Sequence, residues 1–330
     1  MLFFGLCAPA QSAVDLFQAR VPVADQTEAA RTTAVAAALA AVLVRVTGDA
    51  RIAESPDSKP LMENVRSYLQ GTSYEQAGEI LKLRATFDGP ALTAALHAAG
   101  LPFWSANRPS HLLWIGLDGD TPEILDADAR ETLAPLFEAA EARGVPVILP
   151  SSDAQDQDVA EPADIFVGIA DTLLKASRRY NAEQIVSVWV TSTRTHWGAN
   201  WSLLSAKGVT QQWESSGNSA ETALAAGIQH LADFEATQFA IRGVSTALSE
   251  TIVEVDGVQS LADYARALNY LKRLDLAKSV NVVSVQGTRV VFRLRTDSSE
   301  TQLARVIAAG SVLRESAATA RGALGFSLVR

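Results

Sequence analysis

The segment from Leu101 to Asp118, LPFWSANRPSHLLWIGLD, is the feature that most restricts how this chain can fold. Pro102 and Pro109 lack an amide hydrogen and push the residues before them towards extended geometry, which is typical of a linker. The residues from Leu112 to Leu117 then form a short apolar run, of the kind found in strands that are covered on both faces. One structural unit therefore ends here, and the next begins with a buried strand.

The residues before this segment predict an α+β domain over residues 14–105. Val14 to Val23 alternates between apolar and polar residues, as a strand does. Asp25 precedes Glu28 by three residues, a capping-box spacing that predicts the start of a helix, and Gly48 predicts its end. The other elements expected here are a short helix near 61–69, an extended stretch within 73–87 and a helix that begins at Gly89.

Residues 106–243 predict an α/β domain with a mixed sheet. Strands are expected at 111–117, 145–149 and 184–192, and helices separate them. This order implies a parallel βαβ core with right-handed crossovers. Two further strands, near 200–206 and 209–214, are expected to extend the sheet in antiparallel fashion, and a long helix follows them.

The last unit, residues 244–330, predicts the order β-α-β-β-α-β, which is the ferredoxin-like plan. Its final strand is expected at 311–316, and Gly287-Thr288 is expected to form a hairpin turn. The fold class is therefore part α/β and part α+β. A length of 330 residues is consistent with three such domains.

The charge of the chain excludes some classes of partner. A net charge of −9 argues against non-specific binding to nucleic acid or to anionic lipid. Residues 1–243 carry 17 basic and 29 acidic side chains, whereas residues 244–330 carry 11 basic and 8 acidic ones. Two interpretations of the basic end stay open: chance variation between solvated surfaces, or a module that contacts something acidic.

The first 13 residues resemble the end of a signal peptide. Leu2 to Leu6 is apolar, and Ala8-Pro9-Ala10 offers small residues where a signal peptidase cleaves. Cys7 is the only cysteine, so the chain can form no internal disulfide and no cysteine-based zinc site. Leu6 precedes it where a lipoprotein signal has a small residue, so we expect no lipidation. No later stretch looks like a membrane span, and these observations predict a soluble periplasmic protein.

Four segments carry a resemblance to a known family. They are ARVPVADQTEAAR (19–31), AAVLVRVTGD (40–49), LPFWSANRPSHLLWIGLD (101–118) and VPVILPSSDAQDQD (145–158). Together they resemble the bacterial domain of unknown function 2066 family, whose members mostly carry signal peptides. The resemblance covers about residues 14–240. It implies an envelope location and defines no catalytic residue.

Polar residues follow three of the expected parallel strands. These residues are Asp118, Asp153, Arg194 and His196. Ligands of open α/β sheets bind at the carboxyl ends of the strands, so these four side chains are a candidate cleft for a substrate or a small ligand. The alternative is that they only cap helices, form turns or lie on a solvated hairpin.

Two further sets of residues are candidates for an interaction surface. Trp104 and Arg108 lie in the proline linker, where they could anchor a partner or clamp two domains together; we favour the clamp. Arg289, Arg293 and Arg295 alternate along one strand and give it a basic face. That face is either solvated or binds a ligand, and the segment from Val253 to Val258 faintly resembles the start of peptidoglycan-binding repeats of the same topology.

The sequence predicts no cofactor and no metal. The four histidines show no HExxH or similar spacing. Phosphate-binding GxxxxGK[ST] and GxGxxG motifs are missing, and Gly243 to Ala247 lacks the last glycine of a GxSxG elbow. We therefore name no catalytic residue.

These observations favour a periplasmic binding or assembly module of the bacterial envelope that is not an enzyme. Its expected partner is an envelope protein, through which it could associate with the membrane, and nucleic acid is not expected. Two alternatives stay open: an enzyme or small-ligand binder with the cleft described above, and a protein that binds cell-wall glycan through residues 244–330.

Overall fold

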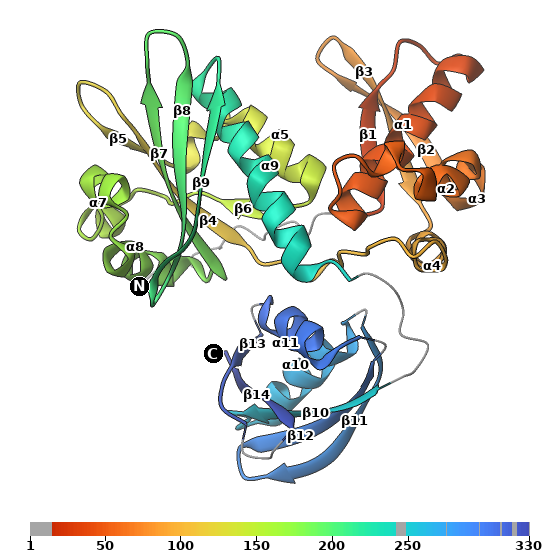
Figure 1. The fold of residues 1–330 in the computed structure, drawn as a ribbon, viewed down its shortest axis with the longest axis vertical. Helices are drawn as coiled ribbons and strands as arrows, with labels where there is room; N and C mark the ends of the chain where they lie inside the picture. Colours follow the sequence, from red (N-terminus) through yellow and green to blue (C-terminus); the bar gives the residue numbers. More distant parts are fainter. Residues whose placement is uncertain are drawn as a thin grey trace, which may run out of the picture.

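The computed structural model describes residues 15–241, 249–274, 276–296, 298–310, 312–318 and 322–329. The expected signal peptide and Cys7, and the glycine-serine segment 243–247, lie outside these residues. The described chain contains three separate sheets, each with its own helices (Figure 1). The predicted mixed α/β and α+β class is confirmed.

The first sheet has the antiparallel order β1-β3-β2. Its unit comprises β1 (Gln18–Pro22), α1 (Glu28–Thr47), α2 (Lys59–Glu63), α3 (Val65–Tyr68), β2 (Leu69–Ala77), β3 (Ile80–Phe87) and α4 (Gly89–Ala98). The extended stretch that we predicted within 73–87 is instead a hairpin of two strands. Gly78, at φ 60°, provides the left-handed turn between them.

The long helix α1 forms the core of this unit. Its N-cap is Thr27, whose hydroxyl accepts a hydrogen bond from the Ala30 amide, while Asp25 accepts one from the Thr27 amide; the predicted Asp25–Glu28 box is therefore wrong. Gly48 ends the helix at φ 74°. By length and composition α1 is the one described helix that could cross a membrane. Much of its surface is buried in the unit's core, where Leu39 and Val42 are fully covered.

The second sheet has the order β5-β4-β7-β8-β9, and β6 pairs with the start of β4. Its strands are β4 (His111–Leu117), β5 (Glu123–Leu125), β6 (Val147–Ile148), β7 (Gln184–Ser192), β8 (Trp197–Ser205) and β9 (Gly208–Gly217). Strands β6, β4 and β7 run parallel, and β8 and β9 continue the sheet antiparallel. The predicted parallel core and antiparallel extension are both present.

Helices cover both faces of this sheet, as the apolar run in β4 requires. The helices of this unit are α5 (Ala134–Arg143), α6 (Ala154–Gln157), α7 (Pro162–Val167), α8 (Ala170–Ser177) and α9 (Ala220–Phe239). Leu113 and Ile115 of β4 face the core under α5 and α9, whereas Leu112 and Trp114 face the core under α7 and α8. The sequence did not predict β5, α6 or α7.

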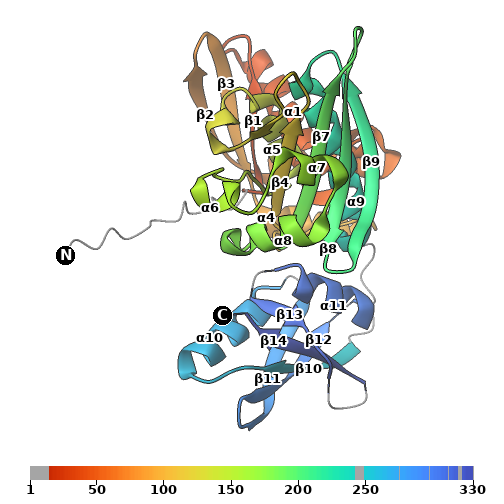
Figure 2. The same cartoon turned by 90° about the vertical axis from the view of Figure 1, so that its left-hand side faces the viewer.

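The third sheet has the order β11-β12-β10-β14-β13. Its unit comprises β10 (Ser249–Asp256), α10 (Leu261–Lys272), β11 (Ala277–Gln286), β12 (Arg289–Thr296), α11 (Glu300–Ala308), β13 (Leu313–Glu315) and β14 (Ala323–Leu328). The β-α-β-β-α order is present, with both helices on one face of the sheet (Figure 2). The end departs from the ferredoxin-like plan: the predicted last strand shrinks to β13, and an unpredicted strand, β14, lies between β13 and β10 and runs parallel to β10.

Candidate functional site: an acidic pocket in the central unit

The four residues predicted to form a cleft do not come together. Asp118 follows β4, and its amide donates to the Val190 carbonyl at 2.8 Å. Arg194 and His196 lie on the exposed turn of the β7–β8 hairpin, where the His196 ring contacts the Thr193 hydroxyl at 3.1 Å. Within the described chain, no hydrogen bond or ion pair joins any two of the four. Strand β7 continues beyond its pairing with the end of β4 into a hairpin, and the turn of this hairpin carries Arg194 and His196.

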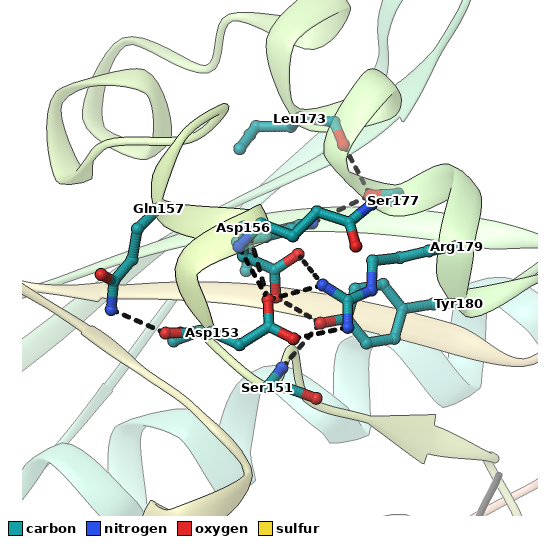
Figure 3. Close-up of polar contacts among 11 residues, drawn as sticks. Ser151, Asp153, Asp156, Gln157, Leu173, Ser177, Arg179 and Tyr180 are labelled. Atoms are coloured by element: carbon teal, nitrogen blue, oxygen red, sulfur yellow. Dashed lines mark hydrogen bonds and ion pairs between the residues drawn. The ribbon is translucent and has the colours of Figure 1, made fainter. Parts of the chain in front are cut away.

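Asp153 belongs to a different cluster, on the loop that follows β6 (Figure 3). It caps α6 by accepting from the amides of Gln155 and Asp156 at 3.1 and 3.2 Å. It also pairs with Arg179, which follows α8: both terminal nitrogens of the guanidinium lie 2.6 Å from the two carboxylate oxygens. This bidentate ion pair fixes the loop after β6 to the end of α8.

Asp156 and Tyr180 extend the cluster inwards. Asp156 is buried; its Oδ1 lies 3.3 Å from Arg179, and its Oδ2 accepts a hydrogen bond from the Tyr180 hydroxyl. The same hydroxyl accepts from the Ser151 amide at 2.7 Å. We call Asp153, Asp156, Arg179 and Tyr180 the polar network. A buried carboxylate requires such partners, because it would otherwise pay a large desolvation cost.

The network shifts the ionisation of its members. The hydrogen bonds from Arg179 lower the pKa of Asp153 to about 2. Burial, and then the hydrogen bond to Asp156, raises the pKa of Tyr180. Asp153 therefore stays ionised and Tyr180 stays neutral at any physiological pH. Neither of these two shifts moves a group towards proton transfer at neutral pH.

Ser152, within the loop that the network holds, has an unusual backbone and an unsatisfied side chain. Its φ of 47° lies in the left-handed region that residues other than glycine rarely adopt. Its hydroxyl oxygen is buried and makes no hydrogen bond, while its carbonyl accepts from the Gln157 side chain at 2.7 Å. Strained residues of this kind persist only where surrounding contacts hold them, and they are frequent at functional sites.

A pocket of about 390 Å³ opens beside this loop. It lies between the segment around β5 and the start of α7. Four carboxylates line it, from Glu123, Asp126, Asp156 and Glu161, together with Ser152, and no basic side chain does. Ile124, Ala160 and Pro162 contribute apolar wall, and the buried Trp114 lies behind it. We call this the acidic pocket; its volume is at the lower end of the range for small-ligand sites.

The acidic pocket adjoins an exposed group of apolar side chains. Phe166, Val167 and Ile169 at the end of α7 are 65%, 68% and 42% exposed, and we call them the apolar patch. Phe166 packs edge-on against Trp189, with ring centroids 5.2 Å apart, so it is held in place despite its exposure. The start of α7 lines the acidic pocket, and five residues of helix separate Pro162 from Val167, which is about 8 Å.

Trp104 and Arg108, for which we considered a partner surface and favoured a clamp between two domains, are buried, at 1% and 8% exposure. The Arg108 guanidinium stacks on the Trp104 ring at 3.8 Å and donates to the carbonyls of both Trp104 and Ser105. It also donates to the carbonyl of Arg45 in α1, at 2.7 Å, and to that of Gly144 after α5, at 2.8 Å. The pair therefore connects the first unit to the second from the inside and offers no surface to a partner.

Two arginines of the basic strand β12 lie close to acidic residues of the neighbouring strand β10. Arg289 forms an ion pair with Asp256 of β10, with Nε 2.7 Å from Oδ1. Arg293 lies 3.8 Å from Glu250 of the same strand. Arg295 is exposed, opposite Glu250 in the β10–β12 register. Acidic residues of β10 thus balance the arginines of β12, and the face does not favour an anionic ligand.

Sequence inspection found one member of the polar network, Asp153, and missed its partners. Arg179 and Tyr180 gave no signal, since they lie 26 and 24 residues from their partners along the chain. The carboxylates are dispersed: in the described part of the chain, no group of three or more His, Cys, Asp or Glu could hold a metal ion.

Comparison with known proteins corrects the family resemblance. The family model that matches is described as Domain of unknown function (DUF8605) and covers residues 10–105, so the resemblance to the domain of unknown function 2066 family is wrong. The matched range contains the first sheet and its helices. The acidic pocket and the apolar patch lie outside it. No curated protein and no solved structure matches the chain.

Proposed function

We propose that this protein is a binding module of the bacterial envelope, exported to the periplasm, and that it holds a protein partner on the central unit. The observation that supports the binding role is the apolar patch. Phe166 and Val167 end the short helix α7, Ile169 follows two residues later, and all three are exposed. Isolated exposed apolar residues are ordinary, but a contiguous group beside a pocket is typical of an interaction site.

The polar network supports binding more than catalysis. Asp153 and Asp156 are occupied by Arg179 and Tyr180, so their charges serve to fix the loop and shape the pocket. The Ser152 hydroxyl has no hydrogen bond to a base that would activate it. The periplasmic location is supported by the apolar Leu2 to Leu6 and the small residues Ala8 and Ala10.

The test is site-specific photo-cross-linking of the full-length protein in intact cells. A photoreactive phenylalanine analogue at Val167 is expected to give a discrete adduct with one envelope protein. The same analogue at Gln211, exposed on the edge strand β9, is the matched control and is expected to give none. Moving the analogue to Ile169 and adding Val167→Asp is expected to reduce the adduct at least five-fold.

Two results would overturn the proposal. Equal adducts from Val167 and Gln211 would show that the apolar patch has no special role. Recovery of the full-length protein from the cytoplasmic fraction, with none in the periplasm, would remove the envelope assignment.

A further inference from the structure

We propose that the acidic pocket binds the side chain of an arginine or a lysine on a segment of the partner protein. This inference rests on the proposed function, because it states that the partner protein carries a basic residue that enters the pocket beside the apolar patch. It starts from three carboxylates that line the pocket: Glu123, Asp126 and Glu161. Within the described residues none of them forms an ion pair, although Asp126 accepts a hydrogen bond from the Asp128 amide at 2.9 Å. Asp156, by contrast, is paired with Arg179 and Tyr180.

The spacing of the carboxylates indicates that the pocket fits a polyatomic cation and not a single metal ion. They line a space of about 390 Å³, and they do not converge on one point as the ligands of a metal ion do. A guanidinium has five N–H donors and an ammonium has three, so either can reach several separated acceptors at once. A polyatomic cation therefore fits the pocket better than a metal ion.

The apolar walls of the pocket indicate that the cationic group is attached to an aliphatic side chain. Ile124, Ala160 and Pro162 line the pocket between the carboxylates. Arginine and lysine place an aliphatic stem along apolar surface and keep the charged end among acceptors.

The apolar patch identifies the source as a protein segment and not a free amine. It lies about 8 Å along α7 from the pocket, a distance that two or three residues of extended chain span. A segment with one basic residue and an apolar residue two or three positions away could occupy both. Residues 1–243 carry many more acidic than basic side chains, and this excess of negative charge is expected to favour a partner segment with a basic residue.

The experiment is a titration of isotope-labelled, full-length protein with a blocked tripeptide, acetyl-Arg-Ala-Leu-amide, in which the apolar residue lies two positions from the arginine, followed by NMR. The Trp114 indole N–H, which donates to the Ser177 hydroxyl at 2.9 Å, is a reporter next to the pocket. We expect saturable shifts with a dissociation constant in the millimolar range. The analogue with citrulline, which replaces the guanidinium by an uncharged urea of similar shape, is expected to bind at least five-fold more weakly.

The matched variants are Glu123→Gln, in the pocket, and Glu138→Gln, exposed on α5 on the other face of the sheet. Glu123→Gln is expected to weaken the arginine tripeptide at least three-fold and Glu138→Gln to leave it unchanged. Equal affinity for arginine and citrulline, equal affinity of wild type and Glu123→Gln, or no saturable shift would each overturn the inference.

The two proposals fail in different ways. A partner that cross-links at Val167 equally in wild type and in Glu123→Gln would overturn the pocket inference and leave the binding function standing. Arginine-specific binding of the tripeptide without any cross-link at Val167 would overturn the proposed function and leave the chemistry of the pocket intact. Binding of spermidine as tight as that of the tripeptide would overturn the assignment to a protein segment.

Discussion

Arg108 is expected to hold the first two units together, and Arg108→Ala tests this role. Its guanidinium donates to five main-chain carbonyls, three of which belong to other elements: those of Arg45, Arg143 and Gly144. Each buried carbonyl left without a donor costs about 1–3 kcal/mol. The loss of stacking on Trp104 adds to this cost, whereas removal of a buried charge offsets part of it.

The net loss of stability expected for Arg108→Ala is about 4 kcal/mol, in the range measured when one partner of a buried charged network is removed. Arg108→Lys keeps the charge but has only three donors on one nitrogen, so a loss of about 2 kcal/mol is expected. Urea unfolding of the full-length protein measures both. Hydrogen exchange is expected to rise first in the last turn of α1 and in the turn after α5, the two segments that the guanidinium joins.

The matched control is Arg51→Ala, which removes an exposed arginine with no side-chain partner in the described residues. Its effect is expected to stay within about 0.5 kcal/mol. If Arg108→Ala unfolds at the same urea concentration as Arg51→Ala, the carbonyl contacts of Arg108 contribute nothing and the reasoning is refuted.

Three further predictions concern other parts of the fold. Asp153→Asn removes the carboxylate whose pKa is lowered from 3.8 to about 2, so wild type is expected to exceed the variant in stability by a constant amount above about pH 5. That difference should shrink as the pH falls through this range to about 2, and a difference as large at pH 2 as at pH 6 contradicts the prediction. Gly227→Ala puts a Cβ 2.1 Å from the Trp201 ring and is expected to cost about 1–3 kcal/mol despite better helix propensity, as thermal unfolding would show; unchanged stability would contradict the contact. Asn107→Ala removes the donor to the Val306 carbonyl of α11, at 2.5 Å, and is expected to loosen the last unit and raise the radius of gyration in small-angle scattering; an unchanged radius would show that other contacts suffice.

The parts of the fold that sequence could predict are those with strong local patterns. The apolar run in β4 and the alternation in β7 require buried strands, and both strands lie where expected. Strand β14 escaped because Gly325 interrupts its pattern; a Cβ there would lie 2.4 Å from the Ala318 amide, so close backbone packing demands glycine. The hairpin of β2 and β3 escaped because Gly78 was not recognised as a turn.

The candidate site shows that the partners of a side chain could not be predicted from the sequence. Asp153 was identified because it follows a strand, but its partner depends on how α8 packs. The position of a strand end was also misjudged: β6 is only two residues long and pairs with the start of β4, so Asp153 lies far from the level of Asp118. Local patterns predict that a strand exists, whereas its length and register depend on contacts with distant residues.

The place of β14 in the third sheet has a consequence for how the chain is made. One main-chain edge of β10, at Val253 and Val255, pairs with β14, and β14 begins at Ala323, about 70 residues later. Until then β10 presents an open edge to its surroundings in a chain that is still being synthesised. A factor that covers the β10 edge would be of most use during this interval.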